Sequence, residues 1–226
     1  MELDPLIDRV LLVNKPLRWT SFDVVRKLRY KLKIKKIGHA GTLDPLATGL
    51  LILCTGKFTK RIEEFQAQEK EYTGRFIIGQ TTPSNDLETA PSDATDISPI
   101  TNDQIHKAVK QFIGVIDQVP PIHSAIFVDG KRAYQLARKG KEVELKARQV
   151  TVTEFEITAI ELPSVSFRVV CSKGTYIRSL ARDFGEALGV GAYLAELCRT
   201  RIGAFRLEDA KKVEEIEPLT NPGHVA

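Results

Sequence analysis

The spacing of apolar residues along the chain predicts a mixture of strands and helices. Four consecutive apolar residues, 10 to 13, indicate a short buried strand over residues 10 to 14, and the apolar residues 50 to 54 indicate a return to the core. Between them, Thr20 and Asp23 have the spacing of a helix capping box, and apolar residues follow at helical intervals. We therefore expect an amphipathic helix over residues 21 to 32.

Later segments continue this mixture without a regular strand–helix–strand repeat. Strands are predicted at residues 71–79, 149–160 and 165–172, where β-branched and aromatic residues are frequent. Helices are predicted from Thr101 onward, at residues 130–140 and along residues 177–188. The acidic stretch 81–100, which contains prolines and serines, is predicted to be an exposed loop. This order favours an α+β fold on a largely antiparallel sheet over a doubly wound one.

Basic residues are concentrated in one segment. The formal net charge of +4 and the pI of about 8.9 are alone a weak sign of a polyanionic partner. Residues 26 to 36 hold seven basic side chains and no acidic one, whereas residues 81 to 100 hold four acids and no base. The basic segment is either a solvated helix face or a contact for phosphates, and both interpretations stay open.

Several classes of protein do not fit the sequence. The first residues lack the basic start and apolar stretch of a signal peptide, and no run approaches the ~18 apolar residues of a membrane span. There is no GxxxxGK[ST] phosphate loop and no GxSxG elbow, and the histidines lack metal-ligand spacing. We therefore expect a soluble cytoplasmic protein without a metal site.

The first candidate site is the glycine-rich segment 38 to 49, GHAGTLDPLATG, which has the composition of a loop. Asp44 stands in this loop between apolar segments, where a carboxylate can project into a cleft. Asp–Pro is also a common turn pair, so a purely structural role is the alternative. His39, which follows a glycine, could equally be an ordinary hydrogen-bonding residue of the loop.

The second candidate site is the segment 173 to 180, KGTYIRSL. Tyr176 and Arg178 are two residues apart and would share a face if the segment is extended. Arginine is a permanently charged fork that can pair with a carboxylate and hold it ionised. The alternative is a surface strand with ordinary polar residues, and Tyr72 could likewise be a core aromatic residue.

Together these segments resemble the tRNA pseudouridine synthase B family, and they occur in the family's order over residues 10 to 206. The matching segments are VNKPLRWTSFDVVRKLR, GHAGTLDPLATG, KEYTGRFIIG, QVPPIHSAIFVDGKRAYQLARKG, CSKGTYIRSLARDFG and YLAELCRTRIGAF. The resemblance implies an α+β pseudouridine synthase fold with a central RNA-binding cleft. It also implies a catalytic domain at residues 1–206 and a short tail at 207–226 without an added RNA-binding domain.

The resemblance further implies a reaction and the residues that carry it. The substrate would be the T-loop uridine of tRNA, uridine-55, isomerised to pseudouridine without a cofactor or metal. Asp44 would be the nucleophile, attacking either C6 of the base or C1′ of the ribose. Tyr72 would stack on the base, while Arg178 would orient Asp44 and keep it ionised. The nucleotide would be flipped out of the T-loop, and its further contacts would be His39, Tyr176, Leu197 and Lys15.

Some positions depart from the family's usual residues. Arg18 stands where glycine is usual, Phe127 where lysine is common, Tyr193 where histidine is frequent and Cys198 where arginine is usual. These departures put particular RNA contacts in doubt. The expected partner is nevertheless the T-arm stem-loop of tRNA, bound by a monomer without an obligate protein partner and without a membrane.

Two rival functions remain. An RNA-binding folding factor without catalysis would gain nothing from a buried carboxylate, whose desolvation is costly. A catalytic subunit of a guide-RNA particle, as in dyskerin-like relatives, would normally carry a further RNA-binding domain for which this chain has no room.

Overall fold

The computed structural model describes residues 4, 7–122, 127–128, 131–132 and 145–218. The chain divides into two compact units. Unit 1 consists of Met1–Tyr72 and Leu197–Ala226, and unit 2 consists of Thr73–Glu196. Two strands, β4 (Lys70–Ile78) and β10 (Ala192–Ile202), begin in one unit and end in the other. Each unit is therefore built around part of both strands.

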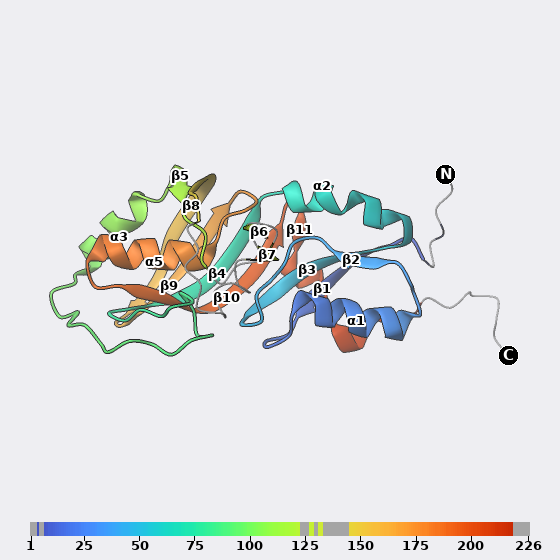
Figure 1. Ribbon diagram of the computed structural model, residues 1–226, viewed down its shortest axis with the longest axis horizontal. Helices are drawn as coiled ribbons and strands as arrows, with labels where there is room; N and C mark the ends of the chain where they lie inside the picture. The colour runs from blue at the N-terminus through green and yellow to red at the C-terminus, as the bar shows by residue number, and fades with distance from the viewer. Residues whose placement is uncertain (1–3, 5–6, 123–126, 129–130, 133–144, 219–226) are drawn as a thin grey trace. The chain divides into compact units, whose positions relative to one another are not determined.

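Unit 1 has helices on a sheet whose inner strands are β1 and β3 (Figure 1). In chain order, its elements besides β4 and β10 are β1 (Val10–Lys15), α1 (Ser21–Leu32), β2 (Ile37–His39), β3 (Ala47–Thr55), η1 (Gly56–Arg61), α2 (Ile62–Ala67), β11 (Phe205–Arg206), η2 (Leu207–Asp209), β12 (Lys211–Lys212) and η3 (Val213–Glu215). The strand order is β12-β1-β3-β10, with β2 paired to β3 and β11 to β10. β1 is antiparallel to β3, whereas β10 is parallel to β3.

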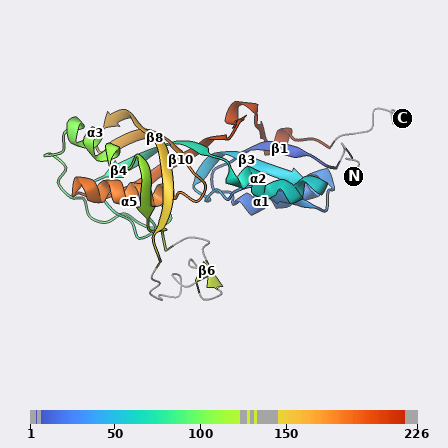
Figure 2. The same cartoon turned by 90° about the horizontal axis from the view of Figure 1, so that it is seen from above.

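The alternation of side chains along β1 and β3 produces two cores in unit 1. On one face, Leu51 and Leu53 pack with Val24 and Leu28 of α1. On the other face, Leu50, Ile52 and Cys54 of β3 pack with Phe65 of α2. Helices α1 and α2 thus cover opposite faces of this sheet, and they overlap when the view is turned by 90° (Figure 2).

Unit 2 is built on a second part of the sheet, in the order β4-β9-β8-β5. Its elements are α3 (Asn102–Lys110), β5 (Gly114–Gln118), β6 (Phe127–Val128), β7 (Lys131–Arg132), β8 (Arg148–Glu161), β9 (Ser164–Cys171) and α5 (Ile177–Leu188). Aromatic rings hold α5 on the sheet: Phe76 stacks on Phe167 with ring centroids 4.1 Å apart, and Phe184 of α5 lies 5.6 Å from Phe76. This packing fixes the helix whose second residue is Arg178.

Most of the predicted elements are confirmed. Helix α1 has the predicted bounds and both hydrogen bonds of the Thr20–Asp23 capping box. The predicted α+β class with a mostly antiparallel sheet is also confirmed. Within the predicted helix at 130–140, residues 131 and 132 instead belong to strand β7, and residues 133 to 140 lie outside the described part. Among the described residues, every helix is too short or too polar to cross a membrane.

The prediction of an exposed loop at residues 81–100 is confirmed except at three residues. Residues 81–100 contain no helix or regular strand, but Thr82, Ser84 and Asp86 are buried rather than exposed. Their polar groups satisfy each other, because the hydroxyls of Thr82 and Ser84 donate to the Asp86 carbonyl at 2.7 and 3.0 Å. Local composition indicated a loop correctly, yet it carried no information about this tertiary burial.

Candidate active site

Asp44 begins a tight turn between two strands of unit 1. The Ala47 amide donates to the Asp44 carbonyl at 3.0 Å, which closes a four-residue turn with Pro45 at its second position. Proline fixes φ there, and aspartate is favoured at the first position of such turns. The turn leads directly into β3, and the Ala40 amide before the loop donates to the Ile52 carbonyl of that strand at 2.8 Å. The sheet therefore supports both ends of the loop, and Asp44 stays partly exposed.

The residue before Asp44 is held by a side chain of α1. Ser21, the buried first residue of that helix, accepts a hydrogen bond from the Leu43 amide at 2.9 Å and donates to the Leu43 carbonyl at 3.2 Å. One hydroxyl thus satisfies both polar backbone groups of a buried residue. This pair of hydrogen bonds ties the loop to the N-terminus of α1.

The residue after Asp44 is held as well. The Arg18 amide donates to the Pro45 carbonyl at 2.7 Å, and the Lys15 Nζ lies 3.5 Å from the same oxygen. Lys15 Nζ also donates to the carbonyls of Trp19 at 2.6 Å and Pro16 at 3.0 Å. Backbone restraints therefore flank Asp44 on both sides.

Arg199 of β10 forms hydrogen bonds with the backbone at both ends of the loop. Its side chain is fully buried and donates to the Leu50 carbonyl at 2.8 Å and to the Gly41 carbonyl at 3.2 Å. The strand that carries Arg199 approaches β3 closely at Gly49, where a Cβ atom would lie 2.7 Å from the Arg199 nitrogen. Gly49 is therefore required by this approach as well as by its φ of 101°.

Buried charges shape the electrostatics of this loop. Burial lowers the pKa of Lys15 to about 8; the carboxylate of Asp44 opposes that shift, and the charge of Arg199 adds to it. Burial also lowers the pKa of His39, again with a contribution from Arg199. These effects favour the neutral form of His39, and Asp44 is the carboxylate that most strongly favours the charged form of Lys15.

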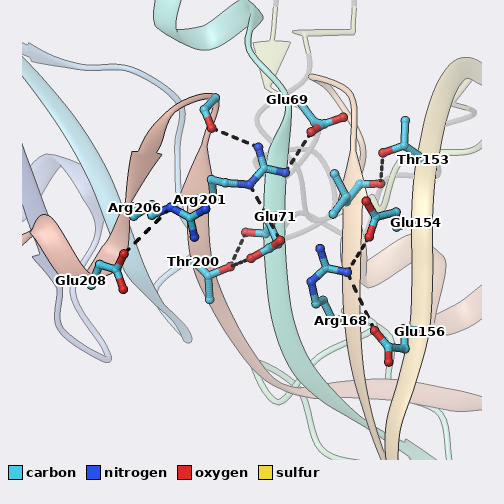
Figure 3. Close-up of polar contacts among 12 residues, drawn as sticks. Glu69, Glu71, Thr153, Glu154, Glu156, Arg168, Thr200, Arg201, Arg206 and Glu208 are labelled. Atoms are coloured by element: carbon cyan, nitrogen blue, oxygen red, sulfur yellow. Dashed lines mark hydrogen bonds and ion pairs between the residues drawn. The ribbon is translucent and has the colours of Figure 1, made fainter.

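Tyr72 and Leu197 lie on the two strands that unit 1 shares with unit 2. Tyr72 is buried on β4, next to Glu71, which accepts a hydrogen bond from Thr200 of β10 at 2.8 Å. Arg201 adds an ion pair to Glu69 at 2.9 Å, as Figure 3 shows. Leu197 pairs in register with Ala47, the last residue of the Asp44 turn. These contacts hold the segment just before Tyr72 against β10, and the register places Leu197 beside the loop.

Arg178 lies in unit 2, where it is buried at the start of α5. Its NH1 lies 3.5 Å from the Asp86 carboxylate and 3.4 Å from the Ser84 carbonyl. Asp86 also accepts a hydrogen bond from the Glu88 amide at 2.9 Å. The buried residues Ser84 and Asp86 of this segment therefore supply the acceptors that face the guanidinium.

Tyr176 precedes this helix as its N-cap residue. Its amide donates to the buried Gln118 side chain at 2.7 Å, and Ser179 donates to the Val119 carbonyl at 2.8 Å. The backbone of Tyr176 is extended, but Arg178 is already helical. The segment is not extended through Arg178, so Tyr176 and Arg178 do not share one face of a strand, as they would in the extended segment considered in the sequence analysis.

Two family profiles identify the family to which the chain belongs. The profile of the TruB family pseudouridylate synthase N-terminal domain matches residues 29–177, and that of the tRNA pseudouridylate synthase B C-terminal domain matches residues 178–221. The chain belongs to the TruB family of pseudouridylate synthases. These enzymes are isomerases.

Relatives in several bacteria support this membership. A TruB-family protein of Flavobacterium johnsoniae, named tRNA pseudouridine synthase B, is 57% identical over 209 residues, which cover 89% of this chain and 91% of the relative. A protein of the same name from Parabacteroides distasonis is 54% identical over 221 residues, 95% of this chain and 94% of the relative. The resemblance drawn from the sequence motifs is therefore confirmed.

Solved structures show the same fold. A chain in the crystal structure of a Cbf5–Nop10–Gar1 complex matches 93% of this chain with a TM-score of 0.72 and 31% identity. A chain in an H/ACA RNP bound to a substrate RNA containing 2′-deoxyuridine matches 94% with a TM-score of 0.68 and 29% identity. The protein spans 55% and 58% of the lengths of those two chains.

The TruB-family chain thus distributes its predicted site residues over both units. Unit 1 holds Lys15, His39, Asp44, Tyr72 and Leu197, and unit 2 holds Tyr176 and Arg178. Lys15, expected to contact the substrate, is instead fully buried with its ammonium bound to backbone carbonyls. In the structure, the Lys15 ammonium links the segment before α1 to the Asp44 loop through these carbonyls.

Sequence reasoning missed three residues of these sites: Ser21, Asp86 and Arg199. Ser21 was hidden by its position at the start of a helix, where serine is common for local reasons. Asp86 lies in a stretch whose acidic composition indicated exposure, and Arg199 resembles any arginine of a basic strand. The available signal for Arg199 was its place in a segment that also contains apolar residues suited to the core. A buried arginine there would need several hydrogen-bond acceptors, and the sequence does not show where these lie.

Proposed function

We propose that this chain is a tRNA pseudouridine synthase that isomerises the T-loop uridine, uridine-55, with Asp44 as its nucleophile. The single observation that carries the proposal is the restraint of Asp44 from both sides, by Ser21 at Leu43 and by Arg18 at Pro45, within a family-matched segment. Catalysis by positioning requires this kind of fixed backbone. The substrate class follows from relatives named tRNA pseudouridine synthase B.

In the proposed reaction the carboxylate of Asp44 attacks C6 of the base or C1′ of the ribose. The bond between N1 and C1′ breaks, the uracil turns, and C5 bonds to C1′. C5 then loses its proton, N1 gains one, and Asp44 is released, so the reaction balances as an isomerisation. No external oxidant, reductant or cofactor enters this scheme.

The remaining site residues have separate proposed roles. Tyr72, which is buried, would stack on the uracil, and Leu197 would contact it beside the Asp44 turn. His39 would take the place left by the flipped nucleotide; its Nδ1 is buried and has no hydrogen-bond partner within the described residues. Arg178 would orient Asp44 in the reacting complex, and Tyr176 would contact the substrate.

The proposal is tested with purified protein and unmodified tRNA, by mapping pseudouridine through chemical labelling. The wild type should convert one T-loop uridine. Asp44→Asn should abolish conversion while tRNA binding and the melting temperature stay nearly unchanged, because the amide retains the shape and removes the nucleophile. Residual activity within tenfold of the wild type would contradict the assignment of Asp44.

A guide-RNA-dependent enzyme is the second candidate, since one structural neighbour is a chain of an H/ACA RNP bound to a substrate RNA and another is a chain of a multi-protein complex. The same experiment separates the two, because it contains neither a guide RNA nor a second protein. Conversion of tRNA by the purified chain alone supports the stand-alone synthase. Conversion only after a guide RNA or a partner protein is added would support the second candidate.

A further inference from the structure

A hollow of about 540 Å³ lies along one side of α1, on unit 1. It is lined by Arg18, Trp19, Asp23, Arg26, Lys27 and Tyr30. The helical members recur at intervals of three and four residues, so they form a continuous stripe. This stripe is separate from the buried stripe of Val24, Val25, Leu28 and Leu32 that packs on the sheet. The hollow is therefore a surface feature of α1 rather than part of its core contact.

The hollow combines aromatic rings with excess positive charge. Three cations line it against one carboxylate, Asp23. That carboxylate already accepts the helix-capping hydrogen bonds of Thr20 and pairs with Arg26 at 2.9 Å. Arg18 and Lys27 form no ion pair within the described residues, and the Tyr30 ring is 87% exposed. Phosphates and base faces are the chemical complement of such a surface.

Arg18 has a backbone conformation that is unfavourable for its residue type. Its φ is 66°, in the left-handed region where glycine is the ordinary choice because a Cβ atom is crowded there. Its amide is used by the Pro45 carbonyl at 2.7 Å, which a glycine amide could serve equally well. The turn itself therefore does not require the arginine side chain, and Arg18 is one of the residues that line the hollow.

The hollow also adjoins the proposed catalytic loop. Arg18 contacts Pro45, the residue that follows Asp44, through the hydrogen bond just described. A strand of RNA with its target uridine at Asp44 would thus pass near Arg18 within the same unit.

We propose that this hollow binds an unpaired nucleotide flanking the target uridine. Tyr30 stacks on its base, and Arg18 and Lys27 contact its phosphates. The proposal rests on the proposed function for the identity of the RNA, and it adds a binding site that is distinct from the reacting base.

The test uses the full chain and an unmodified T-arm stem-loop RNA. Trp19 is the only tryptophan of the protein, so its fluorescence reports occupancy of the hollow directly. The variants are Arg18→Gly, Tyr30→Ala and Tyr30→Phe, and the control is Lys60→Gln. Lys60 is exposed in η1, whose Phe58 packs on the opposite face of the unit 1 sheet, so this control removes one charge away from the hollow.

We expect RNA to quench Trp19 fluorescence in the wild type. Tyr30→Ala should weaken binding roughly fivefold or more, whereas Tyr30→Phe should restore it because the ring is retained. Arg18→Gly should weaken binding several-fold and reduce the slope of log K against log salt by ~0.7. Its melting temperature should equal or exceed that of the wild type, because glycine relieves the left-handed strain. Lys60→Gln should leave affinity within twofold.

Pseudouridine formation is followed in the same samples. If the wild type converts the RNA but Arg18→Gly and Tyr30→Ala bind it with unchanged affinity and salt slope, the hollow is only a solvated surface and the inference is overturned. Unchanged Trp19 fluorescence on binding, measured independently by filter retention, would also overturn it. If the wild type binds and responds as expected but forms no pseudouridine, the proposed function fails while the binding site stands.

Discussion

Replacing Ser21 by alanine tests whether the backbone restraint on the loop positions Asp44. The substitution removes both hydrogen bonds to Leu43, at 2.9 and 3.2 Å, and changes little else because the side chain is small and buried. A buried amide left without a partner costs about 1–3 kcal/mol. For a chain of this size, that loss lowers the melting temperature by roughly 2–4 °C per kcal/mol.

The effect on turnover should exceed the effect on folding. Leu43 is the immediate neighbour of Asp44, so its release shifts the carboxylate, and a displacement of about 1 Å can reduce a rate about 100-fold. We expect Ser21→Ala to lower kcat by roughly 10- to 100-fold while KM changes by less than about twofold, since the substrate contacts are retained. The assay is pseudouridine formation on the T-arm RNA at a temperature well below melting.

Thr20→Ala is the matched control. Thr20 caps the same helix through Asp23, and its loss costs about 1 kcal/mol without a contact to the loop. A general loosening of α1 would affect both variants alike, whereas a specific clamp would reduce kcat only in Ser21→Ala. Normal kcat in Ser21→Ala, or an equal loss in Thr20→Ala, would refute the positioning role.

Three further predictions address the charged groups. The folded state loses the Lys15 proton near pH 8 and the unfolded chain near 10.5, so the unfolded state binds more protons between these values. The unfolding free energy of the wild type, measured with denaturant, should therefore rise relative to that of Lys15→Met as the pH increases through this window, by up to ~1.4 kcal/mol per pH unit. The same pH dependence of stability in both proteins would contradict this prediction. Asp86→Asn should lower the unfolding free energy by about 3–5 kcal/mol and reduce kcat, because Arg178 loses a buried carboxylate partner; wild-type stability and turnover would exclude a role for Asp86 in holding Arg178. Neutralising Lys33, Lys35 and Lys36 together should weaken tRNA binding and flatten its salt dependence, as gel shifts at several salt concentrations would show; an unchanged slope would make this segment a solvated surface.

The local elements could be predicted because their signals are local. Helix α1 was defined by the Thr20–Asp23 capping box and by apolar spacing, and the structure has both features. The Asp44 turn could be expected from Asp–Pro within a glycine-rich loop. In both cases the deciding contacts lie within a few residues, so the sequence pattern and the structure report the same physics.

The support of the site could not be predicted in this way. Ser21 and Leu43 are 22 residues apart, and Arg199 reaches the Leu50 carbonyl across 149 residues. A serine, an arginine or an aspartate has no sequence pattern that reveals a distant backbone partner. Asp86 was misjudged for the same reason, since its burial depends on Arg178, which follows it by 92 positions.

The acceptors of the two buried cations near the loop bear on the proposed role of Asp44 as an ionised nucleophile. Lys15 and Arg199 are both fully buried, yet the hydrogen bonds described for them end on carbonyl oxygens, which solvate a cation without neutralising it. The positive charge therefore persists in unit 1, and Asp44 counteracts the fall in the Lys15 pKa. Because such an interaction is mutual, it also favours the carboxylate form of Asp44 before RNA arrives. Under the proposed function, RNA phosphates would pair with exposed cations such as Lys27 without reaching the buried pair, so RNA binding and the ionisation of Asp44 would depend on different charges.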